Sequence, residues 1–155
     1  MAKLGASAGW HGNCVESMDT ATTLTYKDAG KVFMVTHTGG SASSSGGYTV
    51  TLPTPSNAGA GWTAKFIVNC AVGSTLSDEA SEDVVLNDGQ TDVMVVNYID
   101  SADTSTASVV HDRQADTVGF DHTSLKGDFI EMFTDGTTWF AYGISGADGG
   151  ILVAT

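Results

Sequence analysis

The sequence predicts an all-β protein: an antiparallel β-sandwich or barrel-like domain with an extended N-terminal arm and little helix. The composition favours strands and turns, because only 15% of the 155 residues are charged and much of the polar remainder is Gly, Ser and Thr. No segment keeps the i, i+3, i+4, i+7 spacing of an amphipathic helix over a dozen residues. Short apolar runs instead alternate with turn signals about every ten residues, which is typical of sandwiches and barrels.

The first 20 residues are predicted to form an extended arm ahead of a single β-sandwich domain spanning 21–155. They are rich in Gly, Ala and Ser and show no sustained period. Because aromatic anchors dominate many interfaces, such an arm could dock in a groove of a neighbouring subunit, and its candidate partner-binding residues are Trp10, His11 and Leu4. The alternative is that Trp10 packs over an edge of its own domain. The arm lacks the apolar run of a secretory signal, so synthesis in the cytoplasm is expected.

Turn-bounded apolar runs predict the strands of the first half. The run that starts at Thr22 and the run 32–37 flank the polar turn KDAGK, which predicts a hairpin. The run 48–53 alternates between apolar residues and threonine and then ends at a proline, as a strand does. The run 62–70 places its alternate residues on one inward face, with Cys70 in the core.

The second half continues the same pattern. The acidic stretch 78–89 contains the β-branched pair Val84 and Val85 directly before Asn87-Asp88-Gly89, which favours a strand that ends in a turn. The strongest local signal lies in 126–145, where two apolar runs flank Asp135-Gly136. This dipeptide tolerates the positive φ angles of tight turns, so we expect a hairpin there. Further strands are predicted at 93–99, 108–113 and 116–122.

The aromatic side chains lie within the expected strands and not in basic stretches, so they are interpreted as core residues. Some of them could still line a glycan-binding patch. The set comprises Trp62, Phe66, Tyr98, Phe120, Phe129, Phe133, Trp139, Phe140 and Tyr142.

The charge of the chain argues against two classes of partner. The formal net charge is -12, with six Lys and Arg residues against 18 Asp and Glu. A surface of this sign repels phosphate backbones and anionic lipid, so neither nucleic acid nor membrane is expected as a partner. An acidic exterior suits a protein that stays soluble at high local density, as on the outside of an assembly.

The common catalytic spacings are missing from the sequence, which predicts that the protein is not an enzyme and uses no cofactor. The segment Gly143 to Ala147 comes near a nucleophile elbow around Ser145 but lacks the final glycine. A phosphate-binding loop is absent as well. The two cysteines, Cys14 and Cys70, form neither a disulfide framework nor a zinc site.

No metal site is predicted either. Only His111 and His122 lie close together among the four histidines, which include His11 and His37, and they lack a metal-binding spacing. The acidic groups do not reproduce a calcium-binding loop, and solvated acidic turns explain them more simply. These groups are Asp88/Asp92, Asp100/Asp103 and Asp78/Glu79/Glu82/Asp83.

The order of the strand segments resembles that of small phage virion proteins. The segments are LTYKDAGKVFMV, GYTVTLPTP, GWTAKFIVN and KGDFIEMFTDGTTWFAYGISGADGGI, and together they cover most of the chain from Thr22 to Ile151. The closing hairpin carries the elements of that pattern at Lys126, Gly127, Asp128, Asp135, Gly136 and Trp139. The acidic insert 78–89 and the arm that bears Trp10 depart from it.

The resemblance is to head decoration, or cement, proteins of phage capsids. It implies a structural protein on the outer capsid surface of the virion, made in the host cytoplasm. Its partners would be the major capsid protein and copies of itself, with a homotrimer expected. Its function would be to bridge capsid subunits and stabilise the head.

Related domains occur in phage tail fibres, which leaves an alternative function. In that case the chain would be an appendage module whose exposed loops 39–47 and 55–61 bind a host receptor or glycan. An attachment role without catalysis is common to both readings.

Overall fold

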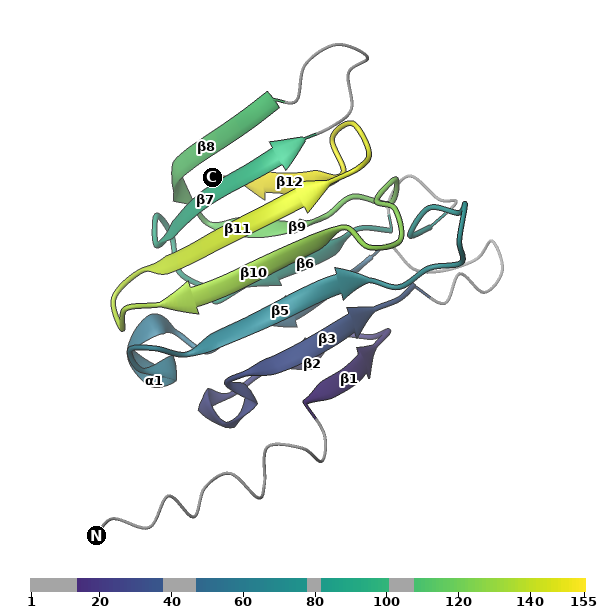
Figure 1. The fold of residues 1–155 in the computed structure, drawn as a ribbon. Helices are drawn as coiled ribbons and strands as arrows, with labels where there is room; N and C mark the ends of the chain where they lie inside the picture. Colours follow the sequence, from purple (N-terminus) through teal and green to yellow (C-terminus); the bar gives the residue numbers. More distant parts are fainter. Residues whose placement is uncertain (1–13, 38–46, 78–81, 101–107) are drawn as a thin grey trace, which may run out of the picture.

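The protein is a two-layered β-sandwich, shown in Figure 1. This computed structural model describes residues 14–37, 47–77, 82–100 and 108–155. The large sheet has seven strands in the order β1 (Val15–Met18), β3 (Lys31–Val35), β5 (Thr63–Val68), β10 (Phe129–Thr134), β11 (Trp139–Ser145), β7 (Met94–Asp100) and β8 (Ser108–Ala115). The small sheet has five, in the order β12 (Ile151–Ala154), β9 (Thr117–Phe120), β6 (Val84–Asn87), β4 (Tyr48–Thr51) and β2 (Thr22–Thr23). The all-β prediction is confirmed.

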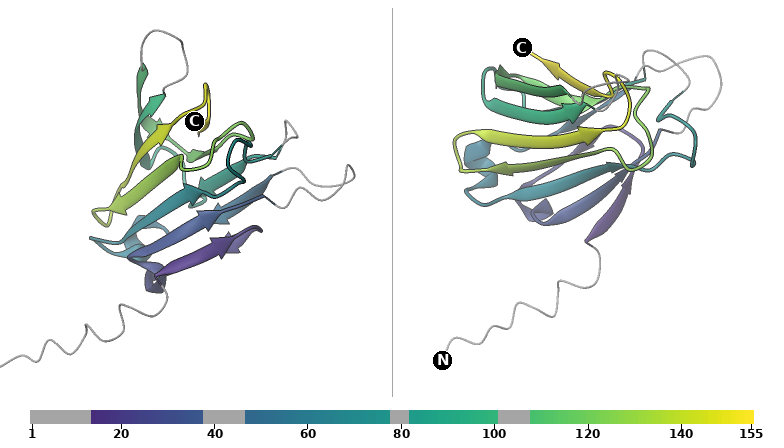
Figure 2. Two further views of the ribbon diagram at one scale, coloured as in Figure 1. Left: turned by 45° about the vertical axis from the view of Figure 1, so that its right-hand side comes forward. Right: turned by 45° about the horizontal axis from the view of Figure 1, so that its top comes forward.

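The prediction of an antiparallel sandwich holds for only part of the strand pairing. Half of the ten ladders between the described strands are parallel, among them β1 with β3, β3 with β5, β2 with β4, and β4 with β6. The reason is that the first six strands alternate between the two sheets. Strands two apart in the chain therefore lie side by side in one sheet, and they run in the same direction. The two layers can be followed from other directions in Figure 2.

The prediction of a hairpin between Thr22 and residue 37 is wrong. β2 belongs to the small sheet and β3 to the large one, and between them lies η2 (Tyr26–Asp28), a single 3₁₀ turn. Thr25 caps this turn, because its hydroxyl accepts from the Lys27 N–H while the Asp28 carboxylate accepts from the Thr25 N–H at 2.7 Å. Such a capping box fixes the direction of the chain as it passes from one sheet to the other.

The hairpin expected in 126–145 is confirmed. β10 and β11 pair antiparallel from Phe129↔Ile144 to Thr134↔Trp139. In the turn, the Asp135 carboxylate accepts from the backbone N–H groups of Thr137 and Thr138 at 2.8 and 2.9 Å. Gly136 has a φ of 96°, a conformation that a side chain disfavours.

The core lies between the sheets and is built from the inward residues of both. Trp62 and Trp139 meet edge to face at 5.1 Å, and Phe33 stacks on Phe66 at 5.2 Å. The small sheet contributes a second set of buried residues: Val50, Leu52, Val84, Leu86, Val118, Phe120 and Ile151. Cys70 was predicted to lie in the core; it packs against the core but is only partly buried.

Two elements at the ends of the chain differ from the expected boundaries. Residues 15–18, expected in the arm, form β1, which extends the large sheet. Met18 is buried there, and Glu16 pairs with Lys31 at 2.6 Å. Residues 151–154 form β12, for which no strand was expected.

In the expected loop 55–61 the chain makes one short helix, α1 (Pro55–Ala58), which Thr54 caps.

Candidate binding surface and polar cluster

The outward face of the large sheet is largely apolar. One row of cross-strand neighbours runs over five strands without a polar residue: Met34, Ile67, Phe129, Ile144 and Ile99. A shorter row holds Phe133, Phe140 and Val95. Between them runs a mixed row of Lys65, Glu131, Tyr142 and Asn97. We call these 12 residues the apolar outer face.

The apolar outer face exposes large side chains to solvent. Tyr142 is 46% exposed, Ile144 44%, Ile99 39% and Phe133 38%. The ring of Phe133 stacks on Phe140 at 4.8 Å and lies parallel to Tyr142 at 6.0 Å. Contiguous apolar surface of this kind is uncommon on a protein that stands alone, and it marks interaction sites.

The charges on this face are few and opposite in sign. The Lys65 ammonium lies 3.9 Å from the centre of the Phe129 ring, a cation–π contact. Glu131 is its cross-strand neighbour, yet within the described part of the chain neither side chain forms an ion pair. A shallow depression of about 360 Å³ lies between Asn97, Glu131, Tyr142 and Ile144.

The outward face of the small sheet is different in kind. Its cross-strand neighbours are short, mostly polar residues: Thr23, Thr49, Thr51, Val85, Asn87, Thr117, Gly119, Leu152 and Ala154. Thr49 and Thr51 are exposed, and none of the described residues on this face is aromatic. Threonine suits a strand that faces water, since it combines a β-branched side chain with a hydroxyl group.

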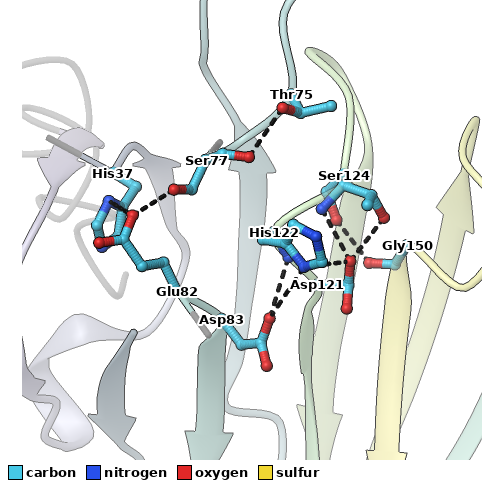
Figure 3. A network of polar contacts seen from close by, with 10 residues as sticks. His37, Thr75, Ser77, Glu82, Asp83, Asp121, His122, Ser124 and Gly150 are labelled. Atoms are coloured by element: carbon cyan, nitrogen blue, oxygen red, sulfur yellow. Dashed lines mark hydrogen bonds and ion pairs between the residues drawn. The ribbon is translucent and has the colours of Figure 1, made fainter. Parts of the chain in front are cut away.

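A polar network lies at one end of the sandwich, shown in Figure 3. His37 Nδ1 lies 3.2 Å from Glu82 Oε2, and the same carboxylate oxygen accepts from the hydroxyl of Ser77. The Ser77 carbonyl in turn accepts from the hydroxyl of Thr75 at 2.9 Å. These contacts hold the segment after β5 against the start of β6.

The second part of this network joins the start of β6 to the end of β9. His122 Nδ1 lies 3.0 Å from Asp121 Oδ1 and 3.9 Å from Asp83 Oδ1. Asp83 Oδ1 also accepts from the backbone N–H of His122 at 3.0 Å. One ligand atom from each of the three side chains lies within 4.8 Å of the other two. This trio is called the Asp-Asp-His cluster below.

The residues singled out by sequence lie in different places. Trp10, His11 and Leu4 fall outside the described residues, as do Asp78, Glu79 and Asp103. His111 and His122 do not come together: His111 Nδ1 contacts Asn97 Oδ1 at 2.5 Å on the large sheet, while His122 belongs to the Asp-Asp-His cluster.

Three further candidates have structural partners. Ser145 is fully buried, with its hydroxyl 3.1 Å from Asp128 Oδ2 and 2.8 Å from the Ala147 carbonyl. Asp100 accepts from the Gly149 N–H at 2.9 Å. Asp88 accepts from the Gln90 N–H at 3.0 Å, and burial raises the pKa of its carboxyl above the ordinary value because desolvation disfavours the charged form.

Four of the aromatic residues interpreted as core stand on the opposite side of the sheet: Phe129, Phe133, Phe140 and Tyr142. Sequence reasoning missed the apolar outer face because it interpreted the aromatic strand residues as core, with a glycan-binding patch as the alternative for some of them. A signal was available. In FIEMF and WFAYGI apolar residues occupy both alternate sets of positions, whereas a strand with one face in water alternates between apolar and polar residues.

No protein-family model matches the chain, and neither does any curated protein or solved structure with which it was compared. The class of protein is therefore defined by the fold and the surface: an all-β sandwich with one apolar and one threonine-rich outer face. Within the described ranges no helix has the length and apolar character needed to cross a bilayer.

Proposed function

We propose that this protein is a structural virion protein that binds the outer surface of a phage capsid, bridges capsid subunits and stabilises the head. The apolar outer face is the observation that carries the proposal, because it offers partly exposed apolar surface across five neighbouring strands. Its side chains sit on paired strands, so little ordering would accompany binding. The resemblance of the strand segments to decoration proteins supports the same function.

The charge distribution supports attachment through this face. The chain carries a net charge of -12, while the apolar outer face carries one Lys and one Glu. Acidic copies repel one another over most of their surface. Contact through a face that is close to neutral avoids this repulsion, and the remaining acidic surface keeps decorated particles apart in solution.

Association of the copies into trimers is part of the proposal. A trimer engages several capsid subunits at once, so modest contacts add up through avidity. The major capsid protein would then be the partner, and no reactive group would be required.

The test is binding to undecorated, expanded capsids followed by electron microscopy. We expect ordered added density with the wild-type chain and loss of that density with Phe133→Ser/Ile144→Ser. The matched control is Thr49→Ser/Thr51→Ser on the small sheet, which should bind as the wild type does. Failure of the wild type to bind at saturating concentration would sink the proposal.

A second candidate function is glycan binding by an appendage module. The observation that favours it is the set of parallel rings of Phe133, Phe140 and Tyr142 beside the depression that Asn97 and Glu131 line. Aromatic surface with a few well-placed polar groups is typical of small-ligand sites. A glycan array probed with the isolated protein distinguishes the two functions, because a decoration protein should leave the array blank.

A further inference from the structure

Two carboxylates face each other where the ladder between β6 and β9 ends. The last registered pair is Val84↔Phe120, and the antiparallel register brings the next residues, Asp83 and Asp121, opposite one another. Like charges directly opposite on neighbouring strands repel. The chain is already strongly acidic, so this position gains from a cation between the two carboxylates.

A histidine nitrogen is directed at the same point. Nδ1 of His122 lies 3.0 Å from Asp121 Oδ1 and 3.9 Å from Asp83 Oδ1. This nitrogen is closed to solvent, and the two carboxylates are the partners that the described residues give it. An imidazole nitrogen faces carboxylate oxygens favourably only when a proton or a metal ion lies between them.

From this arrangement we propose that Asp83, Asp121 and His122 bind a divalent transition-metal ion, with Zn²⁺ as the best fit. Zinc binds imidazole nitrogen and carboxylate oxygen at about 2.0–2.2 Å, so two of its tetrahedral ligands lie about 3.3 Å apart. The distances of 3.0 and 3.9 Å from His122 Nδ1 bracket that separation. The three donor atoms lie within 4.8 Å of one another, so rotations of the side chains towards a common point would bring them into range, and a water would complete the tetrahedron.

The surroundings orient the ligands as a metal site requires. Asp121 Oδ1 accepts from the N–H and hydroxyl of Thr123 at 2.8 and 2.6 Å, and Asp83 Oδ1 accepts from the His122 N–H. A carboxylate has about four lone-pair positions, so each Asp keeps capacity for an ion. Outer hydrogen bonds of this kind hold metal ligands in place. The side chains remain 20–31% exposed, which leaves an entry path from solvent.

The donor set selects the class of ion. Calcium takes six to eight oxygen ligands and magnesium prefers oxygen in octahedral geometry, and neither favours imidazole. One imidazole with two carboxylates suits zinc and its neighbours in the first transition row. The bound ion would join the start of β6 to the end of β9 and stabilise that end of the small sheet.

The experiment is calorimetric titration of Zn²⁺ into the full chain after treatment with a chelator. We expect saturable binding of one ion per chain and a rise in the thermal unfolding midpoint on addition of Zn²⁺. Loss of an outer partner alone typically lowers metal affinity 10–100-fold, so loss of a ligand in His122→Ala or Asp83→Asn should lower it at least about tenfold. Ca²⁺ and Mg²⁺ should give no comparable binding.

The matched control is His111→Ala, which removes a histidine outside the cluster and should leave affinity unchanged. Asp83→Asn keeps the size of the side chain and an oxygen that can accept from the His122 N–H, but it replaces the carboxylate by a neutral amide. A folding defect in His122→Ala therefore does not decide the result, and circular dichroism of each variant checks the fold. Absence of saturable Zn²⁺ binding by the wild type overturns the proposal. Binding that persists unchanged in both cluster variants overturns it as well.

Discussion

The two outer faces of the sandwich differ although the inner faces are alike. Both sheets direct Val, Ile and Phe residues into one core. Outside, the large sheet presents aromatic rings and isoleucines, whereas the small sheet presents threonines and other short residues. Folding needs only one apolar face from each sheet. The second apolar face of the large sheet is therefore surplus to folding, and such a surplus points to a partner.

The largest expected effect comes from truncating either inner face. Phe66→Ala in the large sheet and Phe120→Ala in the small sheet should each lower the free energy of unfolding by about 3–5 kcal/mol, because both rings are fully buried. Urea denaturation of the two variants measures this. If one variant lost much less than the other, the claim that the inner faces are equivalent would fail.

A smaller effect is expected where the chain passes between the sheets. Thr25→Ala removes the cap of η2 and should lower the free energy of unfolding by about 1 kcal/mol. Its control is Thr23→Ala on the outer face of the small sheet, which should cost about half of that or less. Equal losses in the two variants, measured by thermal unfolding, would show that capping is not what distinguishes these threonines.

Truncation of the apolar outer face should affect stability little. Ile144→Ser exposes no interior and should change the free energy of unfolding by about 1 kcal/mol or less, because this side chain is already 44% exposed. Thr49→Ser on the small sheet serves as its counterpart and should change stability by about 0.5 kcal/mol or less. A loss from Ile144→Ser as large as that from Phe66→Ala would show that the face belongs to the fold and not to a partner.

The smallest expected effect concerns pH at the turn after β6. Burial raises the folded-state pKa of Asp88, so the folded chain holds that proton more tightly than the unfolded chain, whose value is near 3.8. The stabilisation is complete below the unfolded value and is lost as pH rises through the folded one. Wild type should therefore gain stability relative to Asp88→Asn as pH falls from 7 towards 4. Urea midpoints across this range test it, and a relative loss on acidification would contradict the assignment.

Local patterns predicted most of the strands, and one of them predicted the closing hairpin. The alternation in Tyr48–Thr51 and the Asp135-Gly136 turn act through near neighbours, so their consequences are visible in the sequence. β1 and β12 were missed because neither alternates: β1 reads Val-Glu-Ser-Met and β12 is apolar throughout. Both depend on pairing with distant strands for their stability.

The candidate sites were less predictable than the fold. The Asp-Asp-His cluster combines Asp83 with the adjacent residues Asp121 and His122. Asp83 is remote from these two in sequence and meets them only through the β6–β9 register. Sequence reasoning noticed Asp83 within an acidic group and His122 among the histidines but did not single out Asp121, and spacing along the chain gave no reason to combine them. The apolar outer face is assembled from five strands in the same way.

By itself the sequence determined an all-β domain, its strongly acidic character and the positions of most of its strands. These properties follow from composition and from side-chain alternation, which act within a few residues. The tertiary structure decided the assignment of strands to sheets, and with it the outward exposure of Phe133 and Tyr142. That choice depends on ladders between distant segments, since both sides of these strands are apolar and alternation alone does not say which side faces the core.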